Sequence, residues 1–280
     1  MRTVPLPDAL GAQVEELDLR QPLSPSVVRD LERAAAQFGV LVFHDQGLDE
    51  SEQIRFTQAL GDSDISHLTS AIAPSIGQPQ HRGVHTGALP NTLYWTHGPG
   101  FDNNGFPDAD QGFGRFHSDL SYQQDPLQYT ILGALESTQT GGETEFVDTG
   151  AAYAALDDSI KQRLAGLEAV HLRKERSGKE HKAVHPVVIR NPNFEIDALY
   201  VNRSFTHSIR GLDHGDPLLE QLIASNENTP ARYRHKWRNG DLVLWDNFRV
   251  LHRRCGFPSD ERRVLLRTQS RRQRPAAALA

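Results

Sequence analysis

Histidine and aspartate stand two residues apart in the segment FHSDL, at positions 117 and 119. The alternation of apolar and polar residues around them predicts a strand, and residues two apart on a strand project from the same face. His117 and Asp119 would then form an aligned pair of metal ligands. The pair alone is weak support, because a chain with 13 histidines contains about one such pair by chance. His214-Gly215-Asp216 is a second match, but the Gly and Pro around it predict a solvated turn.

His252 is a third candidate ligand, near the other end of the chain, after the strand-turn-strand segment NGDLVLWDNFRVLH. Two imidazoles and one carboxylate make the 2-His-1-carboxylate facial triad that binds non-haem Fe(II). Three protein ligands on one face of the ion leave three positions open. Those positions suit a chelating keto-acid co-substrate and dioxygen.

A chelating keto acid needs a cation for its far carboxylate, and Arg263 lies on the strand predicted after His252. A guanidinium presents a fixed fork of donors to a carboxylate. Thr144, which follows Asp119 in the segment GGETEFVD, is the candidate hydroxyl beside it. These two side chains predict a binding site for the co-substrate.

The elements that must position these residues are mostly strands. At least eight strand-like runs fall between residues 113 and 270, regularly separated by turn residues. This spacing predicts a mainly β fold with flanking helices, a double-sheet sandwich of the jelly-roll, cupin-like kind. The chain contains neither an internal repeat nor a linker, so we expect residues 1–280 to form a single domain.

Helical patterns flank these strands. Ser24-Pro25 opens a predicted helix that Gly39 closes, VLVFHD follows as a buried strand, and DESEQIRFTQALG predicts a capped helix ending at Gly61. One continuous helix is predicted over TGAAYAALDDSIKQRLAGLE, with Thr149 as its cap, and another around PLLEQLIAS. Between the framework and the site, residues 62–112 show no pattern, which predicts a long active-site loop.

Composition excludes several classes of protein. With 38% apolar and 24% charged residues the chain is globular, and its net charge of −6 argues against a nucleic-acid partner. No run approaches the ~18 apolar residues that a membrane helix needs. The start MRTVPLPDAL lacks the apolar core of a signal peptide, so we expect a cytoplasmic protein without a membrane partner. The single cysteine, Cys255, excludes an internal disulfide and a thiolate zinc site.

The combined string of His117-x-Asp119, Thr144, His252 and Arg263 resembles the pattern of the taurine and 2,4-dichlorophenoxyacetate dioxygenase (TauD/TfdA) family. These are Fe(II)/2-oxoglutarate-dependent oxygenases on a double-stranded β-helix. GGETEFVDTGAAYAAL is similar to the family's Gly-Gly-Asp-Thr segment, and WRNGDLVLWDNFRVLHRR to its Trp-Asp-Asn segment with the distal histidine. The resemblance covers most of residues 8–270. It departs at 62–112, where the family shapes substrate choice.

The resemblance implies a role for each of these residues. His117, Asp119 and His252 would bind Fe(II), and Thr144 with Arg263 would bind the distal carboxylate of 2-oxoglutarate. The co-substrates would be 2-oxoglutarate and O2.

The resemblance also implies a substrate site and a reaction. Arg267, on the same strand face as Arg263, would bind the anionic group of a small organic substrate, and His67 lies near a family substrate position. The reaction would hydroxylate the substrate and release succinate and CO2, with cleavage where the hydroxylated carbon bears an ether, amine or sulfonate. The family implies a homo-oligomer, either a dimer or a tetramer.

Two alternatives remain open at this point. One is a metal-binding jelly-roll protein without oxygenase activity, which would release no succinate from 2-oxoglutarate. The other is a divalent-metal hydrolase that uses the same three ligands to activate water. A hydrolase works under argon, so oxygen dependence separates it from a dioxygenase.

Overall fold

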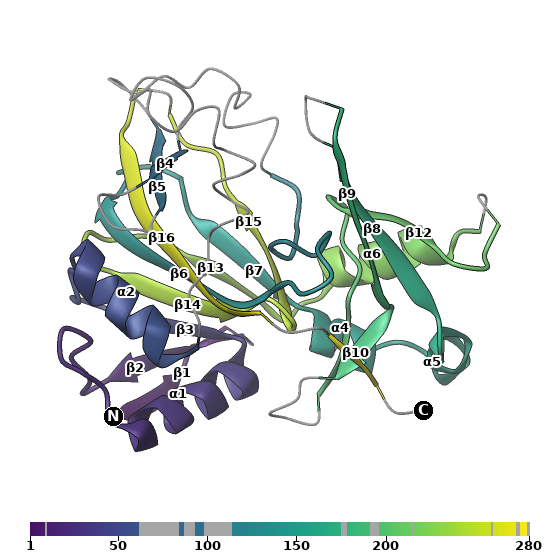
Figure 1. Ribbon diagram of the computed structural model, residues 1–280, viewed down its shortest axis with the longest axis horizontal. Helices are drawn as coiled ribbons and strands as arrows, with labels where there is room; N and C mark the ends of the chain where they lie inside the picture. Colours follow the sequence, from purple (N-terminus) through teal and green to yellow (C-terminus); the bar gives the residue numbers. More distant parts are fainter. Residues whose placement is uncertain are drawn as a thin grey trace.

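Two β-sheets face each other in the computed structural model, which describes residues 1–8, 10–61, 84–86, 93–97, 114–174, 178–190, 196–213, 216–258, 260–272 and 275–278. The larger sheet has the strand order β1-β2-β3-β14-β6-β16-β5-β4, and the smaller one the order β13-β7-β15 (Figure 1). The larger sheet consists of β1 (Arg2–Pro5), β2 (Ala12–Glu15), β3 (Val40–Phe43), β4 (Val84–Thr86), β5 (Leu93–His97), β6 (Leu127–Glu136), β14 (Leu242–Asp246) and β16 (Arg263–Arg272). The smaller consists of β7 (Thr144–Asp148), β13 (Arg232–His235) and β15 (Val250–Arg254).

The central strands of the large sheet are buried on both faces. Along β3, Val40 and Val42 pack between the two sheets, against Phe146 of β7. Leu41 and Phe43 point to the opposite face, where they join a separate apolar cluster. Successive side chains of a strand alternate between faces, so burial of both faces explains why VLVF is continuously apolar.

Two helices cover the outer face of the large sheet (Figure 1). Helix α1 (Pro25–Phe38) begins at the cap Ser24 and ends at Gly39, whose φ of 73° suits glycine. Helix α2 (Glu50–Ala59) begins with a capping box in which Asp49 and Glu52 each accept the backbone N–H of the other. Both helices were expected from the sequence and are confirmed.

A second group of elements lies beside the sandwich (Figure 1). It contains two three-stranded sheets, in the orders β12-β8-β9 and β11-β10-β17. Three helices pack with these strands around one apolar cluster that includes Leu164, Leu199 and Leu222. The elements are α4 (Thr149–Ala154), α5 (Asp158–Leu164), β8 (Glu168–Lys174), β9 (Glu180–Pro186), β10 (Val188–Arg190), β11 (Asp197–Leu199), β12 (Thr206–Ile209), α6 (Leu218–Asn228) and β17 (Ala276–Ala277).

The mainly β jelly-roll prediction is confirmed, but the single helix predicted after β7 is wrong. The segment forms two helices, α4 and α5, because Asp157 adopts an extended conformation and begins the second one. The cap of α4 is Asp148 and not Thr149, since the Asp148 carboxylate accepts the N–H groups of Gly150 and Ala151. Aspartate is as good a cap as threonine, so the pattern did not distinguish them.

The strand predicted over FHSDL is also wrong. Only His117 pairs, through an isolated bridge to His252, and the chain then turns at Asp119, with Leu120 at a φ of 55°. The Asn247 side chain accepts the Asp119 N–H and so replaces the partner that a neighbouring strand would have supplied.

The predicted loop of residues 62–112 contains two strands, β4 and β5, and β5 pairs with β16. The rest of this segment, including His67, lies outside the described residues. Within the part of the chain that the structure describes, no helix is long and apolar enough to cross a membrane.

Candidate metal centre

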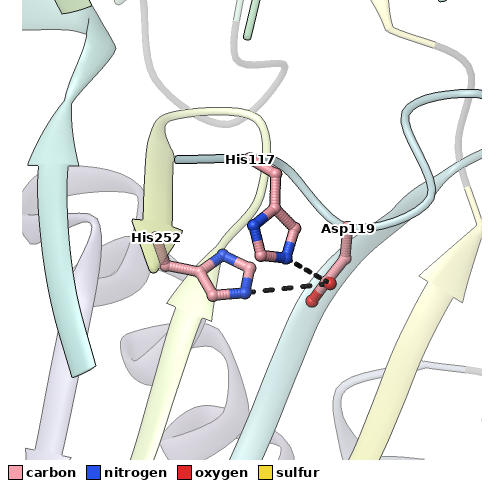
Figure 2. A group of neighbouring side chains, drawn as sticks. All are labelled: His117, Asp119 and His252. Atoms are coloured by element: carbon pink, nitrogen blue, oxygen red, sulfur yellow. Dashed lines mark ion pairs between the residues drawn. The ribbon is translucent and has the colours of Figure 1, made fainter. Parts of the chain in front are cut away.

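The three predicted ligands come from two segments that lie side by side. His117 and His252 exchange backbone hydrogen bonds of 3.1 and 3.0 Å, which aligns their side chains as cross-strand neighbours. Their rings stand 4.3 Å apart between centroids. The turn after His117 then directs Asp119 toward both rings, as Figure 2 shows.

The donor atoms converge on one point. Asp119 Oδ1 lies 3.7 Å from His117 Nε2 and 3.8 Å from His252 Nε2, and all three donor atoms are within 4.8 Å of one another. Two atoms that share an ion at bonds of ~2.1 Å can stand up to ~4.2 Å apart, so both histidine–aspartate separations fit a bridging ion. They are too long for hydrogen bonds. Two nitrogens and one carboxylate oxygen are the donor set that Fe(II) uses in this geometry.

The outer oxygen of Asp119 is fixed by residues of the large sheet. Thr130 Oγ1 donates to Oδ2 at 2.7 Å, Arg267 Nη2 lies 2.7 Å from it, and Gln269 Nε2 lies 3.4 Å away. Because these groups contact Oδ2, Oδ1 faces the histidines. The Asp119 side chain is buried, and its orientation is therefore set before any ion arrives.

Asn247 connects the Asp119 turn to the large sheet. Its Oδ1 accepts from the Asp119 N–H at 3.2 Å and from Trp245 Nε1 at 3.0 Å, while its Nδ2 donates to Thr130 Oγ1 at 2.9 Å. This buried asparagine was not among the predicted site residues. A polar residue directly after a fully buried strand, in the motif LWDN, is the signal that could have identified it.

Hydrogen bonding and burial keep the imidazoles available as ligands. His117 Nδ1 lies 3.1 Å from the Arg115 carbonyl, so Nδ1 carries the proton and Nε2 presents its lone pair. Burial lowers the pKa of His117, and it lowers that of His252 to about 3. Burial alone would raise the pKa of Asp119, but the Arg267 charge and the facing histidines hold it well below its usual range.

The predicted co-substrate residues lie together although they come from the two facing sheets, Arg263 from β16 and Thr144 from β7. Arg263 Nε donates to the Gly142 carbonyl at 3.0 Å, and its Nη2 lies 3.5 Å from Thr144 Oγ1. Burial, together with the nearby Arg254 charge, lowers the pKa of Arg263 to about 9, so the guanidinium stays charged at neutral pH. Trp237 Nε1 donates to Thr144 Oγ1 at 3.0 Å, a contact that the sequence reading missed.

Comparison with known proteins identifies the family. A family model described as "Taurine catabolism dioxygenase TauD, TfdA family" matches residues 2–269. This chain belongs to the TauD/TfdA family. It is 31% identical to an alpha-ketoglutarate-dependent 2,4-dichlorophenoxyacetate dioxygenase of Cupriavidus pinatubonensis, over 94% of this chain and 95% of that protein. It is also 29% identical to an alpha-ketoglutarate-dependent sulfonate dioxygenase of Saccharomyces cerevisiae, over 87% of this chain and 60% of that protein.

A solved structure agrees with the family assignment. The crystal structure of AAD-2 in complex with Mn(II) and N-oxalylglycine superposes with a TM-score of 0.76 and 25% identity, and 99% of each chain is covered. The TauD/TfdA chain described here is thus an Fe(II)- and 2-oxoglutarate-dependent dioxygenase that uses O2. This decides against the two alternatives, a metal-binding module without oxygenase activity and a hydrolase.

Six of the seven predicted site residues fall within the described chain. The three ligands converge on one point, Arg267 contacts Asp119, and Arg263 lies beside Thr144. Asp216, from the second His-x-Asp match, instead pairs with Arg163 and accepts the Leu218 N–H.

Proposed function

We propose that this dioxygenase hydroxylates a small organic anion whose negative group binds Arg267. In this proposal Arg263 and Thr144 bind the distal carboxylate of 2-oxoglutarate. The observation that carries the proposal is the pair of buried guanidiniums on β16, one beside Thr144 and the other beside the carboxylate of Asp119. Buried arginines are retained where they meet anions, because an unpaired buried charge is costly.

Arg267 is suited to hold a substrate anion close to the metal ligands. Its Nη2 lies 2.7 Å from Asp119 Oδ2, and its side chain is almost fully buried. A guanidinium has five N–H donors in a planar fork, enough to contact Asp119 and a second anion together. A substrate bound there would lie next to the donor set of His117, Asp119 and His252.

Aromatic side chains beside the metal ligands support an apolar portion in the substrate. The Phe205 ring stands edge-on to His117 at 5.9 Å between centroids, and Tyr122 packs against Phe205 at 4.9 Å. The Arg173 guanidinium covers the Tyr122 ring and donates to its hydroxyl. Burial raises the pKa of Tyr122, and the Arg173 charge opposes that rise, so the phenol stays protonated. A flat apolar group would fit against these rings.

Each side chain then has a defined role in the reaction. When bound, Fe(II) would supply the oxidative chemistry, in which one oxygen atom of O2 enters the substrate as its hydroxyl and the other enters 2-oxoglutarate, which leaves as succinate and CO2. His117, Asp119 and His252 would hold the ion, and burial of the two histidines keeps their imidazoles neutral. Arg263 and Arg267 orient the two organic anions, and the Phe205 and Tyr122 rings exclude water from one side.

Relatives extend the proposal to a class of substrate. The relatives include a 2,4-dichlorophenoxyacetate dioxygenase and a sulfonate dioxygenase, and both named substrates are small anions. We infer a carboxylate or sulfonate substrate for this chain, without a nucleic-acid or membrane partner. A cytoplasmic location and a homo-oligomer, dimer or tetramer, are part of the same proposal.

A succinate-release screen tests the substrate class. Purified enzyme with Fe(II), 2-oxoglutarate and O2 is offered aryloxyalkanoates, sulfonates, amino acids and N-acyl amino acids, each beside an uncharged ester or amide. We expect succinate release to be coupled to at least one anion and to be lost with its uncharged analogue. Equal turnover of charged and uncharged members of a pair would refute the role of the anion.

Arg267→Ala locates the anion site once a substrate is found. The substrate KM should rise roughly a hundredfold, the effect of losing a charge-assisted contact in a dry site, while the KM for 2-oxoglutarate changes little. Thr130→Val is the matched control, because it also removes a partner of Asp119 Oδ2 but no positive charge. A similar rise in substrate KM in both variants would mean that Arg267 only holds Asp119 in place and does not bind the substrate.

A further inference from the structure

The hydroxyl oxygen of Thr144 lies between two buried donors. Trp237 Nε1 donates to it at 3.0 Å, and Arg263 Nη2 lies 3.5 Å away. A hydroxyl has one hydrogen and two acceptor lone pairs. Because donors approach the oxygen from these two sides, the hydrogen of Thr144 must point in another direction. No described residue accepts that hydrogen.

We propose that Trp237 is a positioning residue for 2-oxoglutarate. Its indole N–H fixes the orientation of the Thr144 hydroxyl, so that the hydroxyl donates to the distal carboxylate of the co-substrate. This inference rests on the proposed function, in which Thr144 and Arg263 bind that carboxylate. A hydroxyl whose direction is set before binding loses less rotational freedom when it meets its acceptor.

A buried polar network holds the indole ring in place. The Trp237 ring meets the His235 ring edge-on, 4.5 Å between centroids at 87°. His235 Nδ1 lies 2.8 Å from the Tyr233 hydroxyl, and His235 Nε2 lies 3.2 Å from Asp241 Oδ2. The other oxygen of Asp241 accepts from His44 Nδ1 at 2.7 Å. His235 and Asp241 are almost completely buried, so the network fixes the surface on which Trp237 rests.

Strand pairing connects this network to the co-substrate site. His235 is the last residue of β13 and stands directly opposite Thr144, the first residue of β7. Trp237 follows two residues later, and its indole reaches back across the strand end to the Thr144 hydroxyl. The paired ends of β13 and β7 therefore carry the ring that supports the indole and the residue that the indole orients.

A double-mutant cycle tests this role by measuring 2-oxoglutarate binding directly. Calorimetric titration of the Mn(II)-loaded protein with 2-oxoglutarate requires no turnover. Trp237→Phe keeps an aromatic ring against His235 but removes the N–H donor. We expect it to weaken 2-oxoglutarate binding roughly three- to tenfold, the effect of one neutral hydrogen bond, with Mn(II) affinity unchanged.

The second position of the cycle is Thr144. In a Thr144→Val background no hydroxyl remains to be oriented, so adding Trp237→Phe should change the affinity by less than about twofold. In a Thr144→Ser background the hydroxyl is retained, and the full effect of Trp237→Phe should return. A purely structural role of Trp237 would instead weaken binding equally in all three backgrounds.

The outcomes separate this inference from the proposed function. If Thr144→Val and Arg263→Ala both leave the 2-oxoglutarate affinity unchanged, the proposed co-substrate site is wrong. If those variants weaken binding but Trp237→Phe has no effect, or has the same effect without the Thr144 hydroxyl, only the role of Trp237 is overturned. Thermal unfolding of each variant identifies any that fails to fold. Trp237→His, which retains a ring N–H, is the rescue variant and keeps the inference testable if Trp237→Phe does not fold: it should preserve part of the 2-oxoglutarate affinity where the Thr144 hydroxyl is present, and a folded Trp237→His whose affinity is the same with and without that hydroxyl would overturn the role of Trp237.

Discussion

Two clusters in this chain contain the same three side chains, two histidines and an aspartate, but differ in the space between them. In the open cluster, His117, Asp119 and His252, both histidine–aspartate separations are 3.7 to 3.8 Å. In the closed cluster, made of His44, His235 and Asp241, the corresponding distances are 2.7 and 3.2 Å.

The difference comes from how each carboxylate is used. In the open cluster a single oxygen of Asp119 faces both histidines, because Thr130 and Arg267 contact the other oxygen. In the closed cluster each oxygen of Asp241 lies against its own histidine, and the Arg238 N–H donates to the oxygen that faces His235. An ion needs a shared oxygen and open space, whereas a hydrogen-bonded network needs neither. Metal binding therefore depends on the groups behind the carboxylate as much as on the ligands.

Replacing the aspartate should have the largest effects, on iron binding in the open cluster and on thermal stability in the closed one. Loss of a residue that only supports a metal ligand typically lowers metal affinity roughly 10- to 100-fold. Asp119 is itself a proposed ligand, so we expect Asp119→Asn to lower Fe(II) affinity by more than this and to abolish succinate formation. Asp241→Asn should still bind one equivalent of iron but unfold at a lower temperature. The new amide NH2 would face the N–H groups of His44 or Arg238, which need an acceptor. Metal analysis after anaerobic loading and thermal unfolding measure both effects. Loss of iron from Asp241→Asn would show that the clusters are not independent.

Arg263→Ala should have the next largest effect, confined to the side of the open cluster that we propose binds the co-substrate. Removing a buried, charge-assisted contact costs about 2 to 3 kcal/mol, so the Kd of 2-oxoglutarate should rise roughly a hundredfold. Arg262→Ala is the matched control, since this neighbouring arginine is exposed and pairs with Glu136. Anaerobic titration of the Fe(II) charge-transfer band measures both. Equal losses would mean that total charge, and not the buried guanidinium, governs affinity.

The sequence was sufficient for the open cluster but not for the closed one. His117, Asp119 and His252 were predicted from residue type and resemblance, although the strand expected to align them is a bridge followed by a turn. The closed cluster left no signal because its members come from three separate segments of the chain with no local motif. His44 and Asp241 are 197 residues apart, and their contact exists only once β3 pairs with β14.

The fold shows the same division between local and long-range signals. Caps and apolar periodicity located α1, α2 and most strands, since these features act within a few residues. Periodicity could not show that the helix after β7 breaks at Asp157, because both halves continue the same pattern. Nor could it reveal Asn247, whose role depends on contacts with Asp119 and Thr130.

Acid should lower the stability of the protein without weakening metal binding over the same range. Burial lowers the pKa of His252 to about 3, from an ordinary value near 6.5, and it also lowers that of His235. Between about pH 6.5 and these folded-state values the unfolded chain binds protons that the folded chain does not. The free energy of unfolding therefore falls as the pH decreases through this window.

Thermal unfolding with and without Mn(II) at two pH values tests whether the histidines of the open cluster stay neutral in acid. Because the folded imidazoles are already neutral, the ion displaces no protons from them, and the rise in Tm caused by Mn(II) should be nearly the same at pH 7 and pH 5.5. The Tm of the metal-free protein should fall between these two pH values. A Mn(II)-induced rise that vanishes by pH 5.5 would show that His117 and His252 titrate near their ordinary pKa.

The smallest effect is expected at the exposed end of the closed cluster. The His44 side chain is 26% exposed and donates to a carboxylate that is buried. His44→Ala should lower stability by about 1 kcal/mol, because water can reach the freed oxygen of Asp241 and replace the lost donor. His44→Asn places an amide donor near the position of Nδ1 and should restore part of that loss. Denaturant unfolding of the three proteins measures the difference. A loss of several kcal/mol in His44→Ala would mean that Asp241 stays dry, and that the closed cluster depends on all of its donors.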